Sequence, residues 1–399
     1  MLIVFKGAHK EPAVRAYERC FVLISRASLL SLRGTERWMI EVATRLGSSV
    51  ILTFSAGLNS IKEPGVRIAE IRRRLGDVEW YELRALDHEH AGKGAPAFLA
   101  RFIKYSGIVV PVDLKIYKLL RQAKVYLAGF DALQATYIAF ISMISGARRF
   151  VIGLHARPNY RRFIYTKPFL KLMHKFGLLR GVHVVNIVDA LMLRQILNNV
   201  PVLWIPNGVD CNKFKPGAKR ADAFYALFVG ALSEDKGFDT FVETARIVRG
   251  RHGDVKFLAA SAGGPLEVIA SRAREEGIVE YLGFVPDDEL VRLYAESHVA
   301  VFPSRDEAFV LVSLEAQASG TPVIATDLPA FRQTVIDGVT GVLVRPHSPQ
   351  AFASAIIKMR ELWLNSRQEY YRVSAAARKN AERFCWEKVV KVYYERLFK

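Results

Sequence analysis

The chain has 399 residues, of which 51% are hydrophobic and 24% are charged, and its formal net charge is +18. This length exceeds one ordinary α/β core and predicts two domains, while the hydrophobic content excludes a disordered chain. The three cysteines (Cys20, Cys211 and Cys385) lie far apart with no C-x-x-C pair, so neither a disulfide framework nor a zinc site is predicted, and a reducing compartment is expected.

Almost all of the basic excess lies in the first half of the chain. Residues 1–200 contain 31 Lys and Arg against 14 Asp and Glu, whereas residues 201–399 contain 26 against 25. Such a field attracts phosphates, whether on a nucleic acid, an anionic membrane or a pyrophosphate-linked acceptor. A basic surface without a partner is the alternative. No nucleic-acid motif accompanies the charge, which argues against a nucleic-acid partner.

The first half alternates apolar strands with helical segments. Only a short apolar run precedes Lys6, so no secretory signal is predicted and a cytoplasmic protein is expected. Apolar, β-branched runs follow at residues 21–25, 50–54, 125–128, 150–154 and 182–187. This alternation predicts a parallel sheet covered on both faces. We interpret residues 125–147 as a strand, a turn and a packed helix, because Asp131 makes a membrane span unfavourable.

The second half repeats the rhythm, with runs at residues 225–229, 255–260, 299–302, 322–326 and 342–344. The prediction is an α/β protein with two doubly wound Rossmann-like domains. Turn residues from Asn198 to Asp210 place the join near residue 200, where a hinge would let the domains close on substrate. We therefore expect domains at residues 1–200 and 201–371, and one C-terminal helix at residues 372–399 that packs back toward the first domain.

The segment from His298 to Gly320 carries the strongest chemical signal. A buried strand ends near Ser304, an acidic loop holds Glu307, and a helix that begins near Leu311 contains Glu315. In an open α/β sheet, ligands bind outside the carboxyl ends of the strands, and the free N–H groups of a following helix suit a pyrophosphate. The two carboxylates can accept hydrogen bonds from hydroxyls at opposite ends of a bound donor.

This pattern resembles the donor site of glycosyltransferase family 4, the retaining enzymes of GT-B fold. The resemblance rests on Glu307, seven intervening residues and Glu315, followed by Gly320-Thr321-Pro322. Further matches follow the family's order over nearly all of residues 201–345: Ile205 to Asp210, Phe228-Val229-Gly230 with Lys236-Gly237, Leu282-Gly283, and Asp337-Gly338.

The resemblance implies a GT-B architecture, with the domains facing across a cleft, and a role for each matching residue. Glu307 should hold the sugar hydroxyls and Glu315 the ribose hydroxyls. Lys236, near Gly230, should neutralise the departing diphosphate without a metal or cofactor. The backbone of Phe309, Val310 and Leu311 should lie against the sugar and diphosphate. The alternative is that the two glutamates are an ordinary loop acid and a solvated helix acid.

Several positions depart from the family pattern. Ala231 stands where an arginine is frequent, so Lys236 is expected to act with another cation, such as Arg305 or one from the first domain. Ala308 and Val310 stand where glycine is common, and Gln333 stands where glutamate is common. These departures leave the donor sugar less defined than the reaction type.

Two features of the first domain complete the expected site. Residues 31–37, with Gly34 and Thr35, resemble the family's glycine-rich loop, although a plain strand-to-helix turn is the alternative. His155 follows the strand at residues 150–154, where the family often places a histidine at the sugar. It could donate a hydrogen bond to a reacting hydroxyl or be purely structural.

Residues 160–180 interleave Lys, Arg and His with aromatic and aliphatic residues. Such a surface can lie on an anionic bilayer, and a solvated helix face packed on its sheet is the alternative. The resemblance implies a retaining transferase that moves a hexose from a nucleotide-diphosphate sugar to an acceptor hydroxyl, and the basic charge favours a lipid-linked or polysaccharide acceptor and peripheral membrane association. A GT-B nucleotide-sugar epimerase and a non-catalytic protein that binds membranes or polyanions are the alternatives.

Overall fold

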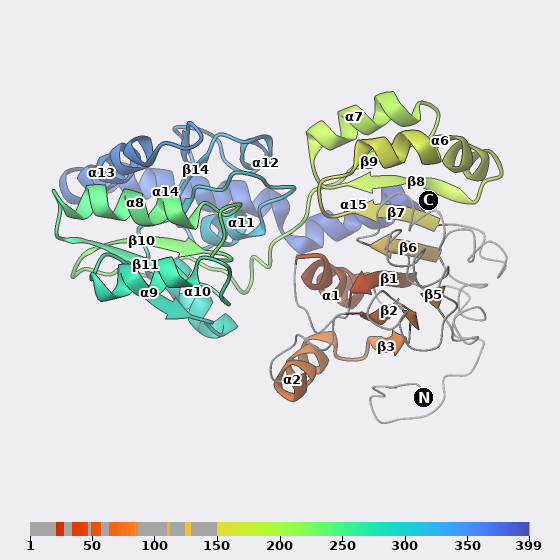
Figure 1. The fold of residues 1–399 in the computed structure, drawn as a ribbon, viewed down its shortest axis with the longest axis horizontal. Helices are drawn as coiled ribbons and strands as arrows, with labels where there is room; N and C mark the ends of the chain where they lie inside the picture. Colours follow the sequence, from red (N-terminus) through yellow and green to blue (C-terminus); the bar gives the residue numbers. More distant parts are fainter. Residues whose placement is uncertain are drawn as a thin grey trace. The chain divides into compact units, whose positions relative to one another are not determined.

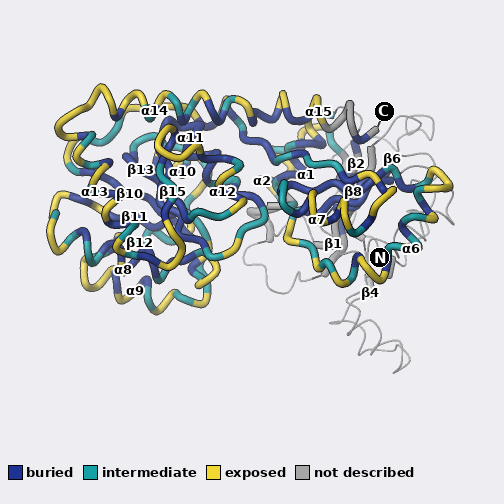
Figure 2. Tube along the Cα trace, turned by 90° about the horizontal axis from the view of Figure 1, so that it is seen from above, coloured by how far each residue is buried: buried dark blue, intermediate teal, exposed yellow. Residues whose placement is uncertain are grey.

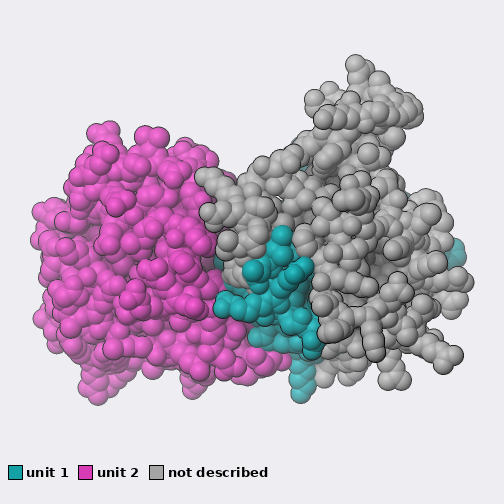
Figure 3. All heavy atoms as spheres, turned by 90° about the horizontal axis from the view of Figure 1, so that it is seen from below, with its two compact units in different colours: residues 1–206, 389–399 teal, residues 207–388 magenta. Residues whose placement is uncertain are grey.

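The computed structural model describes residues 21–27, 34–46, 49–56, 64–83, 85–86, 110–111, 124–128 and 150–398. The chain divides into two compact units (Figure 3). Unit 1 comprises residues 1–206 and 389–399, and unit 2 comprises residues 207–388. The chain therefore enters unit 2 after Pro206 and leaves it after Lys388.

Unit 1 contains a seven-stranded sheet in the order β3-β2-β1-β6-β7-β8-β9, and all of its pairings are parallel (Figure 1). The strands are β1 (Phe21–Ala27), β2 (Ser49–Ala56), β3 (Glu79–Leu83), β6 (Lys124–Ala128), β7 (Phe150–Leu154), β8 (Leu179–Val184) and β9 (Val202–Trp204). Its helices are α1 (Gly34–Leu46), α2 (Pro64–Leu75), α6 (Tyr160–Lys175) and α7 (Ile187–Leu197). A separate antiparallel pair joins β4 (Ala85–Leu86) and β5 (Val110–Pro111). The strand order reverses between β1 and β6, which is where such folds bind ligands.

All five strands predicted for the first half are confirmed. The run predicted at residues 182–187 ends earlier, at Val184, because Asn186 caps α7 by accepting a hydrogen bond from the Val188 N–H at 2.8 Å. The prediction missed β3, which contains two glutamates among its five residues, and β9, which has three residues. Since β9 completes the first sheet, the units divide after Pro206.

Unit 2 contains a six-stranded sheet in the order β12-β11-β10-β13-β14-β15, and its pairings are also parallel. The strands are β10 (Phe224–Val229), β11 (Val255–Ala260), β12 (Glu280–Gly283), β13 (Val299–Phe302), β14 (Val323–Thr326) and β15 (Gly341–Val344). The helices that begin in unit 2 are α8 (Phe238–Arg249), α9 (Glu267–Glu275), α10 (Asp287–Glu296), α11 (Leu311–Ala318), α12 (Pro329–Arg332), α13 (Pro349–Asn365), α14 (Arg367–Ala381) and α15 (Trp386–Phe398). Here the order reverses between β10 and β13.

The core of unit 2 lies between this sheet and its helices, which turn their exposed faces outward (Figure 2). The five predicted strands are confirmed, and β13 and β14 are buried throughout, as expected for central strands of a covered parallel sheet. Together the two sheets confirm the predicted α/β fold class. No helix of the described residues is long and apolar enough to cross a bilayer. In the apolar segment at residues 125–147, the expected strand is present as β6, and the rest lies outside the described residues.

The single helix expected at residues 372–399 is wrong. Helix α14 ends at Ala381, a short 3₁₀ turn follows, and α15 begins only at Trp386. The interruption has a tertiary cause, because the backbone around Cys385 pairs with Val209. The Val209 N–H donates to Phe384 O at 2.9 Å, and the Trp386 N–H donates to Val209 O at 3.1 Å. These bonds pull the chain out of helical geometry.

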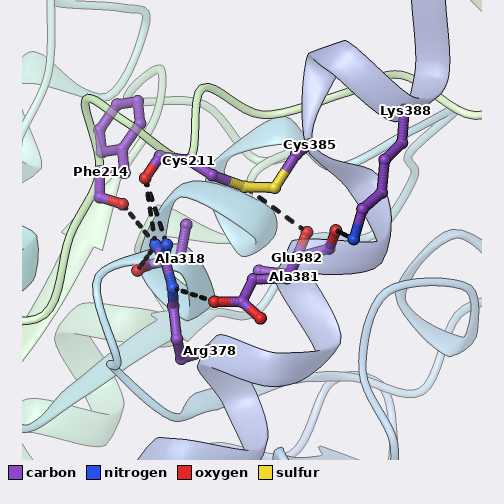
Figure 4. A network of polar contacts seen from close by, with 8 residues as sticks. All are labelled: Cys211, Phe214, Ala318, Arg378, Ala381, Glu382, Cys385 and Lys388. Carbon is purple, nitrogen blue, oxygen red and sulfur yellow. Dashed lines mark hydrogen bonds and ion pairs between the residues drawn. A yellow bond between two sulfur atoms is a disulfide. The ribbon is translucent and has the colours of Figure 1, made fainter. Parts of the chain in front are cut away.

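The expectation that no disulfide forms is also wrong. Cys211 and Cys385 form a disulfide, with their Cα atoms 5.5 Å apart, although 174 positions separate them in sequence (Figure 4). The Val209 pairing brings them together. Beside them the Arg378 guanidinium donates to three carbonyl oxygens, those of Phe214, Ala318 and Cys211, at 2.8, 2.7 and 3.3 Å. The same side chain pairs with Glu382 at 2.9 Å, so it ties α14 to the start of unit 2 and to the end of α11.

Candidate active site

The carboxyl end of β13 brings together two of the residues expected to be catalytic. The Lys236 ammonium donates to Glu307 Oε1 at 2.7 Å, and the Ser304 hydroxyl donates to the same oxygen at 3.0 Å. Lys236 comes from the loop after β10, and Glu307 from the loop after β13. The pair therefore lies where the strand order of unit 2 reverses.

Gly237 holds the Lys236 loop against β13. Its φ of 67° lies in the left-handed region, and a Cβ atom there would come within 1.9 Å of Pro303 O. Only glycine fits such a close approach. Gly237 is also the N-cap of α8, so the start of this helix and the position of Lys236 are fixed together.

The two members of the pair differ in exposure. The Glu307 side chain is 9% exposed, whereas that of Lys236 is 36% exposed. Burial raises the pKa of Glu307 above its usual value, although Lys236 and Ser304 oppose the rise. The ammonium is therefore more open to solvent than the carboxylate.

Glu315 lies on the second turn of α11 and is 8% exposed. Its Oε2 accepts a hydrogen bond from the Tyr294 hydroxyl of α10 at 3.1 Å. Glu315 is thus held by α10, whereas the helix that follows Lys236 is α8. Tyr294 is a residue that the motif did not indicate, since its part in the site comes from packing between α10 and α11.

The start of α11 suits an anion. Phe309 and Val310 are buried, Val310 is the N-cap, and Leu311 is the first helical residue. The side chain of valine cannot accept a hydrogen bond, so it leaves the first N–H groups of the helix uncapped. Gly230 follows β10, and its N–H donates to Ala260 O at 3.2 Å.

Arg305 is held by acids. Its guanidinium pairs with Glu234 at 3.4 Å and also with Asp239, near the start of α8. Two carboxylates already balance its charge, which argues against the expected role as a second cation at the diphosphate. Among the described residues, no cluster of His, Cys, Asp and Glu has the makings of a metal site.

The remaining predicted residues belong to unit 1. Gly34 and Thr35 form the first turn of α1, and the preceding residues 28–33 lie outside the described residues. His155 directly follows β7, and its Nε2 lies 3.0 Å from Tyr126 Oη. Tyr126 in turn contacts His183, a residue for which the sequence offered no role. Tyr126 and His183 both lie inside apolar strands, where sequence patterns do not distinguish a functional side chain from a core one.

The segment that contains this site resembles known proteins. Residues 223–361 match the family model described as glycosyl transferases group 1. A D-inositol 3-phosphate glycosyltransferase of Geodermatophilus obscurus is 37% identical over 215 residues, covering 47% of this chain and 45% of that protein. Another from Thermobispora bispora is 32% identical, covering 53% and 55%. The chain thus spans about half the length of the curated relatives it matches.

Solved structures resemble the chain over nearly its whole length. Sucrose-phosphate synthase from Thermosynechococcus elongatus has a TM-score of 0.69 at 20% identity, covering 95% of this chain and 99% of that one. HepE from Anabaena in complex with UDP has a TM-score of 0.69 at 18% identity, with the same coverage. The chain thus has the fold of the GT-B class. More narrowly, the match of residues 223–361 to the glycosyl transferases group 1 family confirms the resemblance indicated by the sequence.

Proposed function

We propose that the protein is a retaining glycosyltransferase that moves a hexose from a nucleotide-diphosphate sugar to an acceptor hydroxyl. The observation that carries this proposal is the Lys236–Glu307 pair at the strand-order reversal of unit 2, inside the segment that matches the family. The relatives are named as glycosyltransferases, and the HepE structures hold UDP, UDP with glucose, or UDP-glucose. These findings support a nucleotide-sugar donor on unit 2.

In this proposal, the donor diphosphate lies at the start of α11 and beside Lys236. Cleavage of the glycosyl–phosphate bond places negative charge on the leaving oxygen, and the Lys236 ammonium stabilises that charge. Glu307 orients the ammonium and accepts hydrogen bonds from the sugar. Glu315 accepts them from the ribose. The departing diphosphate takes the proton of the incoming hydroxyl, which attacks from the same face and so retains the configuration.

The proposal is tested by donor transfer in Lys236→Met and Glu307→Gln variants. We expect each to lower kcat by about 10²- to 10³-fold, because each removes a group that acts on developing charge or on the sugar. Lys256→Met is the control, since it removes an exposed lysine from the amino-terminal half of β11. Unchanged transfer in both site variants would favour a binding protein. Epimerisation of the donor without an acceptor would favour the epimerase.

The proposed acceptor site lies on unit 1, whose surface around α6 suits an anionic bilayer. This helix contains no acidic residue, and it exposes Arg161 and Lys175. Two aromatic side chains stand out from it, Tyr165 at 82% exposure and Phe176, just after its end, at 68%. A bilayer takes up exposed rings, and each cation near an anionic surface contributes about 1 kcal/mol. We therefore place the protein peripherally on the cytoplasmic face of a membrane, with a lipid-linked or polysaccharide acceptor.

Flotation with liposomes tests this association. The wild type should float with vesicles that contain anionic lipid and much less with neutral ones. A Tyr165→Ser/Phe176→Ser double variant should lose most of the binding. Val268→Ser is the control, because Val268 is 80% exposed on α9 of unit 2. Equal flotation with both lipid compositions would count against an electrostatic bilayer partner.

A further inference from the structure

A chain of polar contacts crosses the sheet of unit 1 next to His155. Tyr126 of β6 places its hydroxyl oxygen 3.0 Å from His155 Nε2 and 2.5 Å from His183 Nδ1. His183 lies on β8, and its Nε2 is 2.8 Å from the backbone oxygen of Ile205. Since β7 lies between β6 and β8, the Tyr126 ring spans β7 to reach His183.

The sheet is built to admit this contact. Gly153 of β7 lies beneath the Tyr126 ring, and a Cβ atom at Gly153 would come within 1.9 Å of the Tyr126 oxygen. From α1, the Trp38 ring covers the group, with its centroid 4.4 Å from that of His155 and 4.7 Å from that of Tyr126. Trp38 and His183 are almost fully buried. Hydrogen bonds in such a place are stronger because little water competes for them.

Elementary donor and acceptor rules fix the position of each proton in this series of contacts. The Ile205 oxygen can only accept, so His183 carries a proton on Nε2. Burial lowers the pKa of His183 to about 4, so the ring is neutral near pH 7 and its Nδ1 has only a lone pair. The Tyr126 hydroxyl therefore donates to His183 Nδ1. Because that donation uses its one proton, the Tyr126 oxygen accepts from His155, whose proton must lie on Nε2.

We propose that Tyr126 and His183 are positioning residues that fix the proton of His155 on Nε2 and leave Nδ1 to accept a hydrogen bond from a substrate hydroxyl. This inference rests on the proposed function and on the family resemblance, by which a histidine at this position meets the sugar. It gives His155 the role of an acceptor, the reverse of the donor role considered from the sequence. Nδ1 is shielded from solvent, so a hydroxyl that reaches it meets little competition from water.

Nitrogen NMR of the full chain labelled with ¹⁵N-histidine tests the proton's position directly. The His155 signals are assigned by their loss in His155→Gln. We expect the Nε2–H tautomer in the wild type and a mixture of tautomers in Tyr126→Phe, which removes only the hydroxyl. Tyr370→Phe is the matched control, because it removes a buried hydroxyl that donates to His298 O in unit 2. An Nδ1–H tautomer in the wild type, or an unchanged His155 spectrum in Tyr126→Phe, would overturn the inference.

Transfer kinetics then test whether Tyr126 and His183 affect the reaction through His155. We expect Tyr126→Phe to lower kcat by about 10-fold or more with a small change in KM, since a histidine held in the wrong tautomer loses its function. In a His155→Ala background, Tyr126→Phe should cause no further loss. Equal losses in both backgrounds would show that Tyr126 only supports the fold and would contradict the inference.

The two measurements separate the possible failures. If no donor is transferred by the wild type, the proposed function is wrong, and the NMR result still decides where the His155 proton lies. If the wild type transfers the donor sugar and His155→Ala keeps full transfer activity, the contacts of Tyr126 and His183 with His155 have no part in the reaction. His183→Asn is the conservative variant. The asparagine side-chain oxygen can replace Nδ1 of His183 as the acceptor for Tyr126, so this variant should preserve the His155 tautomer.

Discussion

At the scale of single residues, burial decides how the charged and titratable groups of unit 2 behave. Glu307 is almost buried but is held by Lys236 and Ser304, so a carboxylate is kept close to a reachable ammonium. His298 shows the opposite case. It is fully buried at the start of β13, its ring stacks on Phe224 with centroids 4.7 Å apart, and its Nδ1 accepts from the Tyr225 N–H at 3.0 Å.

The burial of His298 predicts a pH dependence of stability. Burial, aided by the nearby charges of Lys219 and Arg367, lowers the pKa of His298 from its usual value of 6.5 to about 3. Between these values the unfolded chain binds the proton and the folded chain does not, so stability falls as the pH drops from about 6.5 toward 3. His298→Asn keeps an acceptor for the Tyr225 N–H but does not titrate.

Thermal melts of the wild type and His298→Asn from pH 7.5 to 4.5 measure this contribution. We expect the Tm of the wild type to fall more steeply with acid than that of the variant, whatever their difference at pH 7.5. Carboxylates shared by both proteins cancel in the comparison. Parallel Tm curves over this range would show that His298 takes up no proton on unfolding.

At the scale of elements, the connection from β10 to α8 positions Lys236, and Gly237 is its critical residue. An alanine there meets two penalties, a positive φ and a Cβ atom within 1.9 Å of Pro303 O. Gly277, which follows α9, offers a matched comparison. Its φ is 66°, but nothing lies within 4 Å of a Cβ built there. The pair of substitutions therefore separates backbone strain from the close approach to β13.

We expect Gly277→Ala to cost about 1 kcal/mol of unfolding free energy, the usual penalty for a left-handed residue that gains a side chain. Gly237→Ala should cost about 1–3 kcal/mol more, since the Lys236 loop must move away from β13. It should also lower transfer activity, whereas Gly277→Ala should not. Urea denaturation measures the stability difference. Equal losses would mean that the loop relaxes without disturbing the site.

At the scale of the whole molecule, the sequence predicts what depends on local pattern and misses what depends on tertiary contact. Runs of β-branched residues identified the strands of both sheets that lie in the core. The spacing of Glu307 within its motif, with Lys236 upstream, identified two groups that meet at 2.7 Å. The Tyr126–His183 contact escaped prediction because both residues lie in strands that read as core. The break at Cys385 escaped because its cause, Val209, lies 176 positions away.

The disulfide closes unit 2 close to the points where the chain enters and leaves it. Cys211 lies four residues after Asn207, and Cys385 lies three residues before Lys388. A bond between segments so distant in sequence restricts the unfolded chain strongly, and loss of a disulfide typically costs about 2–4 kcal/mol. The Val209 backbone bonds and the four contacts of Arg378 persist without it. They should hold the segments around Cys211 and Cys385 together if a reducing compartment opens the disulfide.

We therefore expect a Cys211→Ser/Cys385→Ser double variant to fold but to unfold at a lower urea concentration than the oxidised wild type. Cys20→Ser is the control, since it leaves the pair intact. Adding a thiol reductant should lower the midpoint of the wild type to that of the double variant and leave the double variant unchanged. Thiol titration in denaturant, which should find one free cysteine before reduction and three after it, checks the starting state. If the wild type and double variant shared one midpoint without reductant, the disulfide would contribute nothing, and the backbone pairing with Arg378 would suffice to close unit 2.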